Sequence, residues 1–266
     1  MKTIRLLTAT DLHQSRWMYE ALENAVREHK PDVVALVGDF LHAYEDSEGD
    51  RRYSPEECAS RLAALPCEVV FTRGNHEMEN WQPFVRRWLH ERRVPRVPHG
   101  EAFTFGPLVL VAFPCTFGNE EYFLMGRENN TSKMREWLPK ICRQYGPAAR
   151  TLWLLHEPPA GTRLSESEGI MAGVDEWRDA IEDYQPWLTV SGHDHETPVF
   201  DGHWRDKIGQ TTCLNLGQPS RLTHTTKTLH YGLFDFEFAG TEPSLPRRVT
   251  ITAYPWKETF VVPGKV

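Results

Sequence analysis

Residues 4–13 read Ile-Arg-Leu-Leu-Thr-Ala-Thr-Asp-Leu-His, a short apolar run that ends at an aspartate and a histidine. A run of this length is too short for a typical helix and is characteristic of a buried strand. Apolar residues then recur at helical spacing until Pro31 ends the helix. A second apolar run over residues 33–37 ends at Gly38 and Asp39. The opening of the chain therefore predicts a strand, a helix and a second strand.

The same alternation extends outward from this opening. Residues 54–57, Ser-Pro-Glu-Glu, are a helix start with a capping box. Residues 68–72 form a third apolar run, which ends at Arg-Gly-Asn-His-Glu, residues 73–77. This rhythm predicts a largely parallel sheet. Later strand-like runs, with a helix at 174–184 among them, cover residues 108–113, 151–155, 187–190, 212–216, 230–238 and 248–254. The whole pattern predicts an α/β fold.

The composition limits the class of protein. The chain has 266 residues, 40% of them hydrophobic, which suffices for a sizeable core. We expect a single domain over residues 1–266, with room for a cap or insertion within residues 80–150. The net charge of −7 gives no electrostatic footprint for tight nucleic-acid binding, although it leaves room for a local basic patch. Five scattered cysteines, with no signal peptide and no membrane-length apolar run, predict a cytoplasmic protein without a membrane partner.

Eight polar side chains share one feature, because each follows directly after an apolar run. They are Asp11, His13, Asp39, Asn75, His76, His156, His193 and His195. Ligands of open α/β sheets bind beyond the carboxyl ends of the strands, so we expect these groups at one rim. An extended backbone would point Asp11 and His13 to the same side, and likewise His193 and His195. Oxygen and imidazole donors without thiolate suit Mn²⁺, Fe, Zn²⁺ or Ni²⁺, and their number suffices for two ions that share one carboxylate.

Each block also has an ordinary structural interpretation when it is taken alone. A glycine and aspartate after a strand usually form a turn, and a lone histidine such as His156 is more often structural than a ligand. The paired histidines at 193 and 195 are harder to explain without a metal. Five blocks in order, each after a strand, make coincidence improbable.

The five blocks together resemble the calcineurin-like metallophosphoesterases. The resemblance rests on Asp-x-His, Gly-Asp, Gly-Asn-His-Glu, His and Gly-His-x-His, in that order, between Asp11 and His195. It implies a four-layer α-β-β-α sandwich, in which two mixed β-sheets are flanked by helices. It places the metal site at the carboxyl-terminal rim of the strands.

The resemblance also implies a role for each of the eight residues. One divalent ion would be bound by Asp11, His13, Asp39 and His195, and a second by Asp39, Asn75, His156 and His193. Asp39 would bridge the two ions, with manganese expected first and iron, zinc or nickel as alternatives. His76 would be the general acid. Two such ions activate a hydroxide that attacks phosphorus, and an imidazole can protonate the departing oxygen.

The resemblance leaves several functions open. We expect a metal-dependent hydrolase of a small phosphorylated substrate, a phosphodiesterase before a phosphomonoesterase. The run Gly-Asp-Phe-Leu-His at 38–42 is similar to that of repair exonucleases, so a nuclease is the alternative enzyme. His42 is then either a substrate or outer-shell contact or, as we prefer, a solvated loop residue. A non-catalytic scaffold of the same fold is the alternative outside enzymes. Asn215 and Gln218 are either rim contacts or turn residues, and the sequence does not indicate the oligomeric state.

Overall fold

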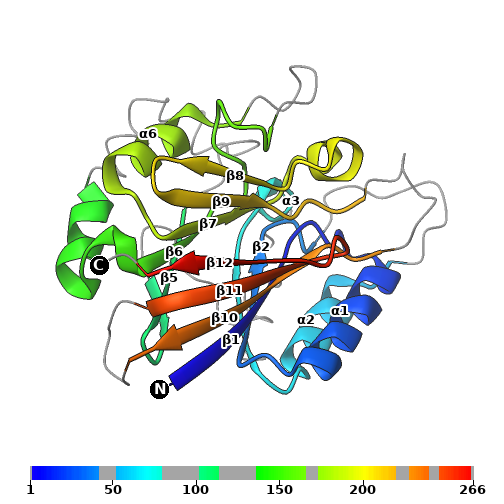
Figure 1. Ribbon diagram of the computed structural model, residues 1–266. Coiled ribbons are helices and arrows are strands. Elements are labelled where there is room, and N and C mark those ends of the chain that lie inside the picture. Colours follow the sequence, from blue (N-terminus) through cyan, green and yellow to red (C-terminus); the bar gives the residue numbers. More distant parts are fainter. Residues whose placement is uncertain are drawn as a thin grey trace.

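The computed structural model describes residues 2–41, 52–79, 102–113, 136–165, 173–219, 228–239 and 246–264. These residues form two six-stranded sheets (Figure 1). The first sheet has the order β12-β11-β10-β1-β2-β3. Its strands are β12 (Glu258–Pro263), β11 (Pro246–Tyr254), β10 (Tyr231–Phe238), β1 (Lys2–Ala9), β2 (Val33–Val37) and β3 (Glu68–Thr72). The strands β1, β2 and β3 are parallel, whereas β10, β11 and β12 are added antiparallel.

The second sheet has the order β4-β5-β6-β7-β9-β8. Its strands are β4 (Ala102–Phe105), β5 (Leu108–Ala112), β6 (Thr151–Leu154), β7 (Leu188–Ser191), β9 (Thr211–Asn215) and β8 (Arg205–Ile208). The four central strands are parallel, and the edge strands β4 and β8 are antiparallel to their neighbours. Both sheets are therefore mixed.

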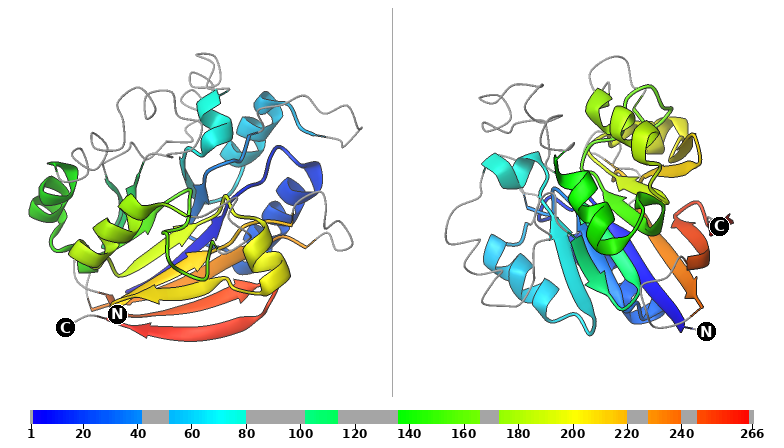
Figure 2. Two further views of the ribbon diagram at one scale, coloured as in Figure 1. Left: turned by 90° about the horizontal axis from the view of Figure 1, so that it is seen from above. Right: turned by 90° about the vertical axis from the view of Figure 1, so that its left-hand side faces the viewer.

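Helices cover the outer face of each sheet (Figure 2). α1 (Arg16–His29) and α2 (Pro55–Ala63) pack on the first sheet through a cluster that includes Leu22 and Leu62. α6 (Asp175–Tyr184) and a helical segment at 136–145 pack on the second sheet. Short helices α3 (Asn75–Glu79), η1 (Ala148–Arg150) and η2 (Thr197–Asp201) complete the described elements. The expected four-layer sandwich of two mixed sheets is confirmed.

The main core lies between the two sheets. The inner faces contribute apolar side chains such as Phe234 and Phe236 from β10 and Val190 from β7. In β2, Ala35 faces this inter-sheet core while Leu36 faces the helices. A central strand with both faces buried is apolar along its whole length, which is why these strands stand out in the sequence.

Three strands are missing from the sequence-based expectations, and all three lie at sheet edges. β4 and β8 flank the second sheet, and β12 ends the first. β8 reads Arg-Asp-Lys-Ile, so it lacks the apolar run by which the central strands were recognised. Edge strands are commonly short and charged because they face solvent. The helical segment at 136–145 and the short helix η2 were also not predicted.

Parts of the chain on which predictions fall lie outside the described residues. Within the range 80–150, the described residues 102–113 belong to the second sheet, and 136–145 to the helix that covers it. Residues 80–101 and 114–135, where the sequence left room for a cap or insertion, are outside the description, as is His42. The single-domain assignment stays a prediction. In the described part of the chain, no helix is long and apolar enough to cross a membrane.

Candidate metal centre

All eight polar side chains singled out from the sequence lie at one rim of the sandwich. Asp11 and His13 follow β1, Asp39 follows β2, and Asn75 and His76 begin α3 after β3. From the second sheet, His156 follows β6, and His193 and His195 follow β7. The carboxyl ends of the parallel strands of both sheets therefore meet here, and each sheet supplies part of the site.

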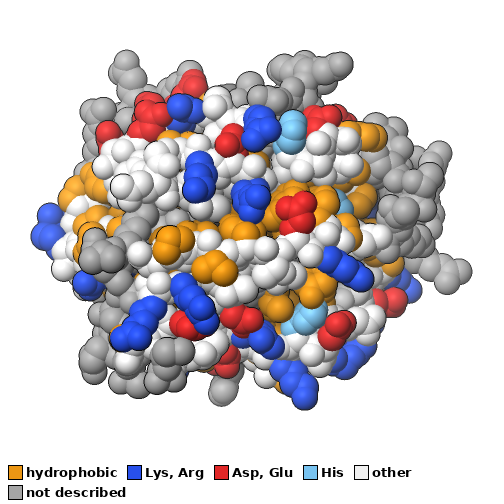
Figure 3. Space-filling model, viewed as in Figure 1, with side chains coloured by type: hydrophobic (Ala, Val, Ile, Leu, Met, Phe, Trp, Pro, Cys, Tyr) orange, Lys and Arg blue, Asp and Glu red, His pale blue; other side chains and the backbone are white. Residues whose placement is uncertain are grey.

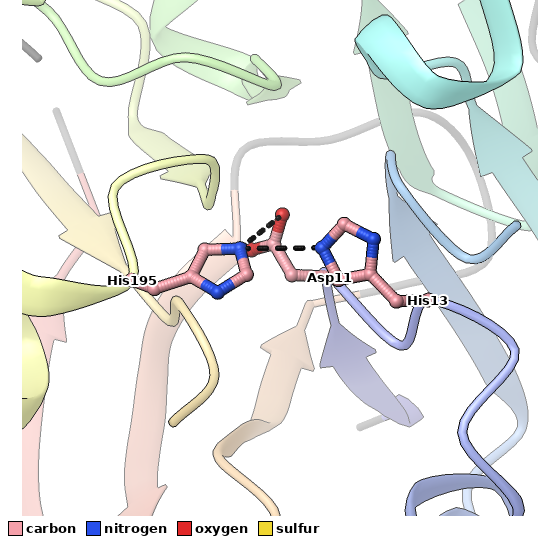
Figure 4. Close-up of side chains that lie close together, drawn as sticks. All are labelled: Asp11, His13 and His195. Carbon is pink, nitrogen blue, oxygen red and sulfur yellow. Dashed lines mark hydrogen bonds and ion pairs between the residues drawn. The ribbon is translucent and has the colours of Figure 1, made fainter. Parts of the chain in front are cut away.

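One cluster consists of Asp11, His13 and His195, whose ligand-type atoms lie within 4.8 Å of one another. Nε2 of His195 is 3.4 Å from Oδ1 of Asp11 and 3.4 Å from Nε2 of His13. Figure 4 shows the three side chains pointing toward one another, Asp11 and His13 from the loop after β1 and His195 from the loop after β7. The Asp11 carboxylate is fully buried and also accepts the backbone N–H of His193.

A second cluster consists of Asp39, His156 and His193, again within 4.8 Å of one another. Nε2 of His156 is 3.3 Å from Oδ2 of Asp39. Oδ1 of Asn75 lies 3.0 Å from that same nitrogen and 3.1 Å from Nδ1 of His193. The four side chains are those that the family resemblance assigns to one ion.

Asp39 also belongs to a third group, with His13 and His76. Nε2 of His76 is 3.7 Å from Oδ2 of Asp39, and the His76 ring stands edge-on to His13 at a centroid distance of 4.7 Å. The backbone N–H of His76 donates to Oδ1 of Asp39 at 2.9 Å. The Asp39 carboxylate therefore lies between the two clusters, and His76 lies beside both.

The donor set fits a pair of divalent ions. Nδ1 of His156 lies 3.1 Å from the carbonyl of Val37. Donation of a proton to that carbonyl leaves the lone pair of Nε2 facing Asp39 and Asn75, which is the usual arrangement of a metal-binding histidine. The Nε2 atoms of His13 and His195 face each other, and a cation bound between them and the Asp11 carboxylate would be a ligand partner for all three groups. Imidazole, carboxylate and amide donors suit a first-row divalent metal.

The electrostatics of the clusters keep several donors ready for a cation. Burial lowers the pKa of His13 well below its usual value, and burial together with His156 lowers the pKa of His193. Burial opposes the charge of Asp39, but His156, His13 and His76 together outweigh it and lower the pKa of that carboxyl. Burial likewise opposes protonation of His156, yet Asp39 raises its pKa to about 10, so a metal ion at Nε2 takes the place of a proton there. Two neutral imidazoles and an ionised shared carboxylate result.

The rim loops are not extended, which corrects the sequence-based expectation. Asp11, His13, Asp39 and His193 have φ values of 54°, 44°, 50° and 63°, in the left-handed region. Non-glycine residues there cost of order 1–3 kcal/mol each and cluster at functional sites. The strands have already ended at these residues, and the backbone N–H groups of Asp11 and His13 instead donate to the carbonyls of Gly38 and Asp39. The pairs still converge, but through turns and not through strand alternation.

Three glycines lie in direct contact with the clustered side chains. A Cβ on Gly74 would lie 2.2 Å from Oδ1 of Asp39, and one on Gly38 would lie 2.3 Å from Nδ1 of His156. A Cβ on Gly192 would lie 2.3 Å from Oδ2 of Asp11. The glycines that precede Asp39, Asn75 and His193 are therefore required for space.

Glu77 ties two rim loops together, a role that the sequence analysis did not identify. Its fully buried carboxylate accepts backbone N–H groups from Asp39 and Leu41 at 2.7 Å each, and from Gly74 at 2.8 Å. Burial and the nearby Asp39 carboxylate raise the pKa of Glu77 to about 8. Its position in the Gly-Asn-His-Glu block, directly after His76, was the feature of the sequence that could have indicated this role.

Asn215 and Gln218 have structural roles. Nδ2 of Asn215 donates to the carbonyls of Leu164 and Asp194 at 3.0 Å each, and its Oδ1 accepts from Gly217. Gln218 is fully buried and bonded to the backbone of His230. Asn215, the last residue of β9, thus holds the loop that carries His193 and His195, and both side chains are bonded to the backbone.

The comparisons with known proteins show the family and the fold. A model of the calcineurin-like phosphoesterase family matches residues 4–197. A dimetal phosphatase from Danio rerio has a similar structure, with a TM-score of 0.67, 12% identity, and coverage of 98% of this chain and 99% of that chain. No curated protein sequence matches the chain.

Two further solved structures are similar. A Thermus thermophilus protein has a TM-score of 0.57 and 12% identity, and covers 98% of this chain and 99% of its own. A Plasmodium protein described as GAP50, the anchor in the inner membrane complex, has a TM-score of 0.58 and 9% identity, with 100% and 90% coverage. At these identities the likeness establishes the fold alone.

The glycine contacts predict a specific effect on metal binding. We expect Gly74→Ala to weaken Mn²⁺ binding at least about tenfold, about 1.4 kcal/mol, because the new methyl group displaces the Asp39 carboxylate. Isothermal titration calorimetry with Mn²⁺ measures the change. Gly202→Ala is the control for backbone strain without a contact, since φ at Gly202 is +69° and a Cβ there meets nothing within 4 Å; we expect it to keep wild-type Mn²⁺ affinity. Equal affinities of the Gly74 variant and the wild type would contradict the assigned role of the contact.

The Glu77 tie predicts a loss of stability. Glu77→Gln keeps the shape but has one acceptor oxygen for three N–H groups, and a buried donor left without a partner costs about 1–3 kcal/mol. Urea unfolding of the metal-free protein measures the difference. Glu57→Gln is the control, because Glu57 accepts a similar bond from Ser54 at an exposed helix start, where water can replace it. A Glu77 variant as stable as the Glu57 variant argues against the tie.

Proposed function

Because the chain belongs to the calcineurin-like phosphoesterase family, we propose that it is a metal-dependent phosphoester hydrolase that acts on phosphodiesters. The observation that carries this proposal is the position of Asp39, whose carboxylate lies between two clusters of ligand-type side chains. A carboxylate in this position can bridge two neighbouring ions, which in two-metal sites lie about 3.5–4 Å apart. The family and the grouping together suggest a dinuclear centre.

The residues that would hold the ions follow from the clusters. Asp11, His13 and His195 would hold one ion and Asn75, His156 and His193 the other, with Asp39 shared. When bound, a pair of divalent ions supplies Lewis acidity at the phosphate oxygens and lowers the pKa of water. Manganese remains our first expectation, with iron, zinc or nickel as alternatives, because affinity depends on supply as well as on the donors.

His76 would act as the general acid. Its side chain is 15% exposed and sits beside both clusters, so it can reach a bound substrate without leaving the rim. Its backbone N–H is bonded to Asp39, which fixes its position relative to the shared carboxylate. Proton donation from Nε2 to the departing oxygen would neutralise the charge that forms there, worth about 10²–10⁴ in rate.

A diester is the first substrate class to test and a monoester the alternative. The two differ in charge, because a diester carries one negative charge and a monoester between one and two near neutral pH, with a second pKa of about 6. A nuclease is the alternative enzyme, and the net charge of −7 disfavours it. A cytoplasmic location stays a prediction.

The scaffold alternative is weaker for a chemical reason. The similar structures include one described as a dimetal phosphatase and one described as an anchor, so the fold does not choose between enzyme and scaffold. A scaffold does not need seven ligand-type side chains at one rim with a histidine beside them. The presence of all eight residues in this chain supports a catalytic function.

The first experiment is hydrolysis of bis-p-nitrophenyl phosphate with added Mn²⁺. We expect turnover by the wild type and none by Asp39→Ala, because both ions lose a shared ligand. His76→Ala should lower kcat by about 10²–10⁴ and keep its Mn²⁺ affinity. Asp183→Ala, on the exposed face of α6, and His203→Ala, outside the clusters, are the matched controls.

Three outcomes would change or contradict the proposal. Loss of Mn²⁺ binding by the His76 variant would make His76 a ligand and not the acid. Faster cleavage of p-nitrophenyl phosphate than of the diester would make the protein a monoesterase. No turnover of either substrate with Mn²⁺, Fe²⁺, Zn²⁺ or Ni²⁺ would favour the scaffold.

A further inference from the structure

A groove of about 510 Å³ runs between the edge strands of the two sheets, β8 and β12. It is lined by Arg163, Arg205, Asp206, Lys207, Thr212 and residues 260–263. Figure 3 shows basic side chains over β8 and hydrophobic side chains over β12 below them. None of the lining residues belongs to the two metal-type clusters, so this groove is a separate feature of the molecule.

The β8 wall of the groove is positively charged. Arg205 and Lys207 are paired with Leu214 and Thr212 of β9, and Leu214 faces the inter-sheet core. The two cations therefore project from the inner face of β8 toward β12. The Arg205 guanidinium lies 4.3 Å from the centre of the Phe260 ring. The inner face of β8 therefore carries positive charge, whereas the inner face of a central strand carries apolar side chains.

The cations of the groove have no acidic partner among the described residues. The one carboxylate in the lining, that of Asp206, accepts the backbone N–H groups of Arg163 and Lys207 at 2.9 and 2.8 Å. Arg163, Arg205 and Lys207 form no ion pair within that part of the chain. A locally positive groove therefore exists on a chain whose net charge is −7.

The β12 wall offers an unused strand edge. The backbone N–H of Gly264 donates to the carbonyl of Arg247 in β11 at 2.7 Å. In an antiparallel pair, every second residue is bonded to the partner strand, and the residues between point their backbone groups the other way. In this register the backbone groups of Val261 and Thr259 therefore face away from β11, toward the free edge of β12. That edge faces the second sheet, because the Trp187 indole N–H donates to the Pro263 carbonyl at 3.1 Å. Val261 is 54% exposed, and it is one of two large apolar side chains so exposed among the described residues.

We propose that this groove binds an extended acidic segment of a partner protein. The segment adds to the free edge of β12 by backbone hydrogen bonds, as in known cases of strand addition. Its alternate side chains then point into the groove, where acidic groups meet Arg205 and Lys207. The stems of these cations and the Phe260 ring supply apolar contact beneath the charges.

Three alternative roles for the groove leave some of its features unused. Inward charges on an edge strand can simply prevent sheet aggregation, but that purpose does not need Arg163, which comes from a separate loop. A second copy of the chain would bring the same cations against each other across a two-fold axis, and like charges repel. A small anion would use the cations and leave the β12 edge and the apolar floor without a partner.

The test uses the whole protein and a fluorescein-labelled peptide, Thr-Glu-Thr-Glu-Thr-Glu-Thr, with binding followed by fluorescence anisotropy. We expect the double variant Arg205→Glu, Lys207→Glu to raise the Kd at least about tenfold. The control is Lys140→Glu, Arg143→Glu, which makes the same change of charge on an exposed helix elsewhere and should bind as the wild type does.

A backbone variant separates strand addition from simple charge attraction. Val261→Pro removes an N–H that the ladder with β11 does not use, and proline is tolerated at such edge positions. We expect it to raise the Kd at least about tenfold while the melting temperature and phosphodiester hydrolysis stay at wild-type values. Peptide binding is measured separately from hydrolysis, so a negative result for the proposed phosphodiesterase activity would not decide this test.

Several results would overturn the inference. If a peptide with lysine in place of glutamate bound as tightly as the glutamate peptide, acidic groups would not be what the groove recognises. The same conclusion would follow if the Lys140→Glu, Arg143→Glu control weakened binding as much as the Arg205→Glu, Lys207→Glu variant. Unchanged binding by the Val261 variant would remove strand addition. Displacement of the peptide by inorganic pyrophosphate at a lower concentration than the unlabelled peptide requires would mean that the groove is a small-anion site.

Discussion

The contact between the His156 imidazole and the carbonyl of Val37 joins the two sheets at the rim on which the candidate site depends. Val37 is the last residue of β2 in the first sheet, and His156 follows β6 in the second. The ring is fully buried and fills the space left by Gly38 and Gly74. With one nitrogen on the first sheet, the other necessarily faces Asp39 and Asn75. A side chain from one sheet thus completes a cluster whose oxygens come from the other.

The inter-sheet core sets the spacing that this contact needs. Both clusters combine residues from the two sheets, so a small shift of one sheet against the other would separate their atoms. The core between the sheets is built from large buried side chains such as Trp187, Phe234 and Phe236, which resist such a shift because interiors are close-packed. Glu77 and Asn215 then hold the individual loops in place. Stability and the candidate chemistry are therefore coupled through the same packing.

Much of this arrangement could be predicted from the sequence, for a physical reason. Central strands with two buried faces are apolar runs, and polar side chains directly after such runs mark the rim. That reasoning located Asp39 and His156 without any knowledge of how the sheets pack. The features that it missed depend on three-dimensional context. The left-handed backbone at Asp11 and the partners of Glu77 follow from how the loops meet, and the edge strand at 205–208 carries charge where a core strand would carry apolar residues.

The most direct test of the central claim is the number of metal ions that the protein binds. The wild type would be stripped with a chelator, reloaded with Mn²⁺, separated from free ions and analysed for manganese by mass spectrometry, with electron paramagnetic resonance on the same sample. The geometry around Asp39 predicts two ions per chain and a spin-coupled signal, because the shared carboxylate holds them close together. A content of one ion per chain, or two ions without coupling, would contradict a centre bridged by Asp39.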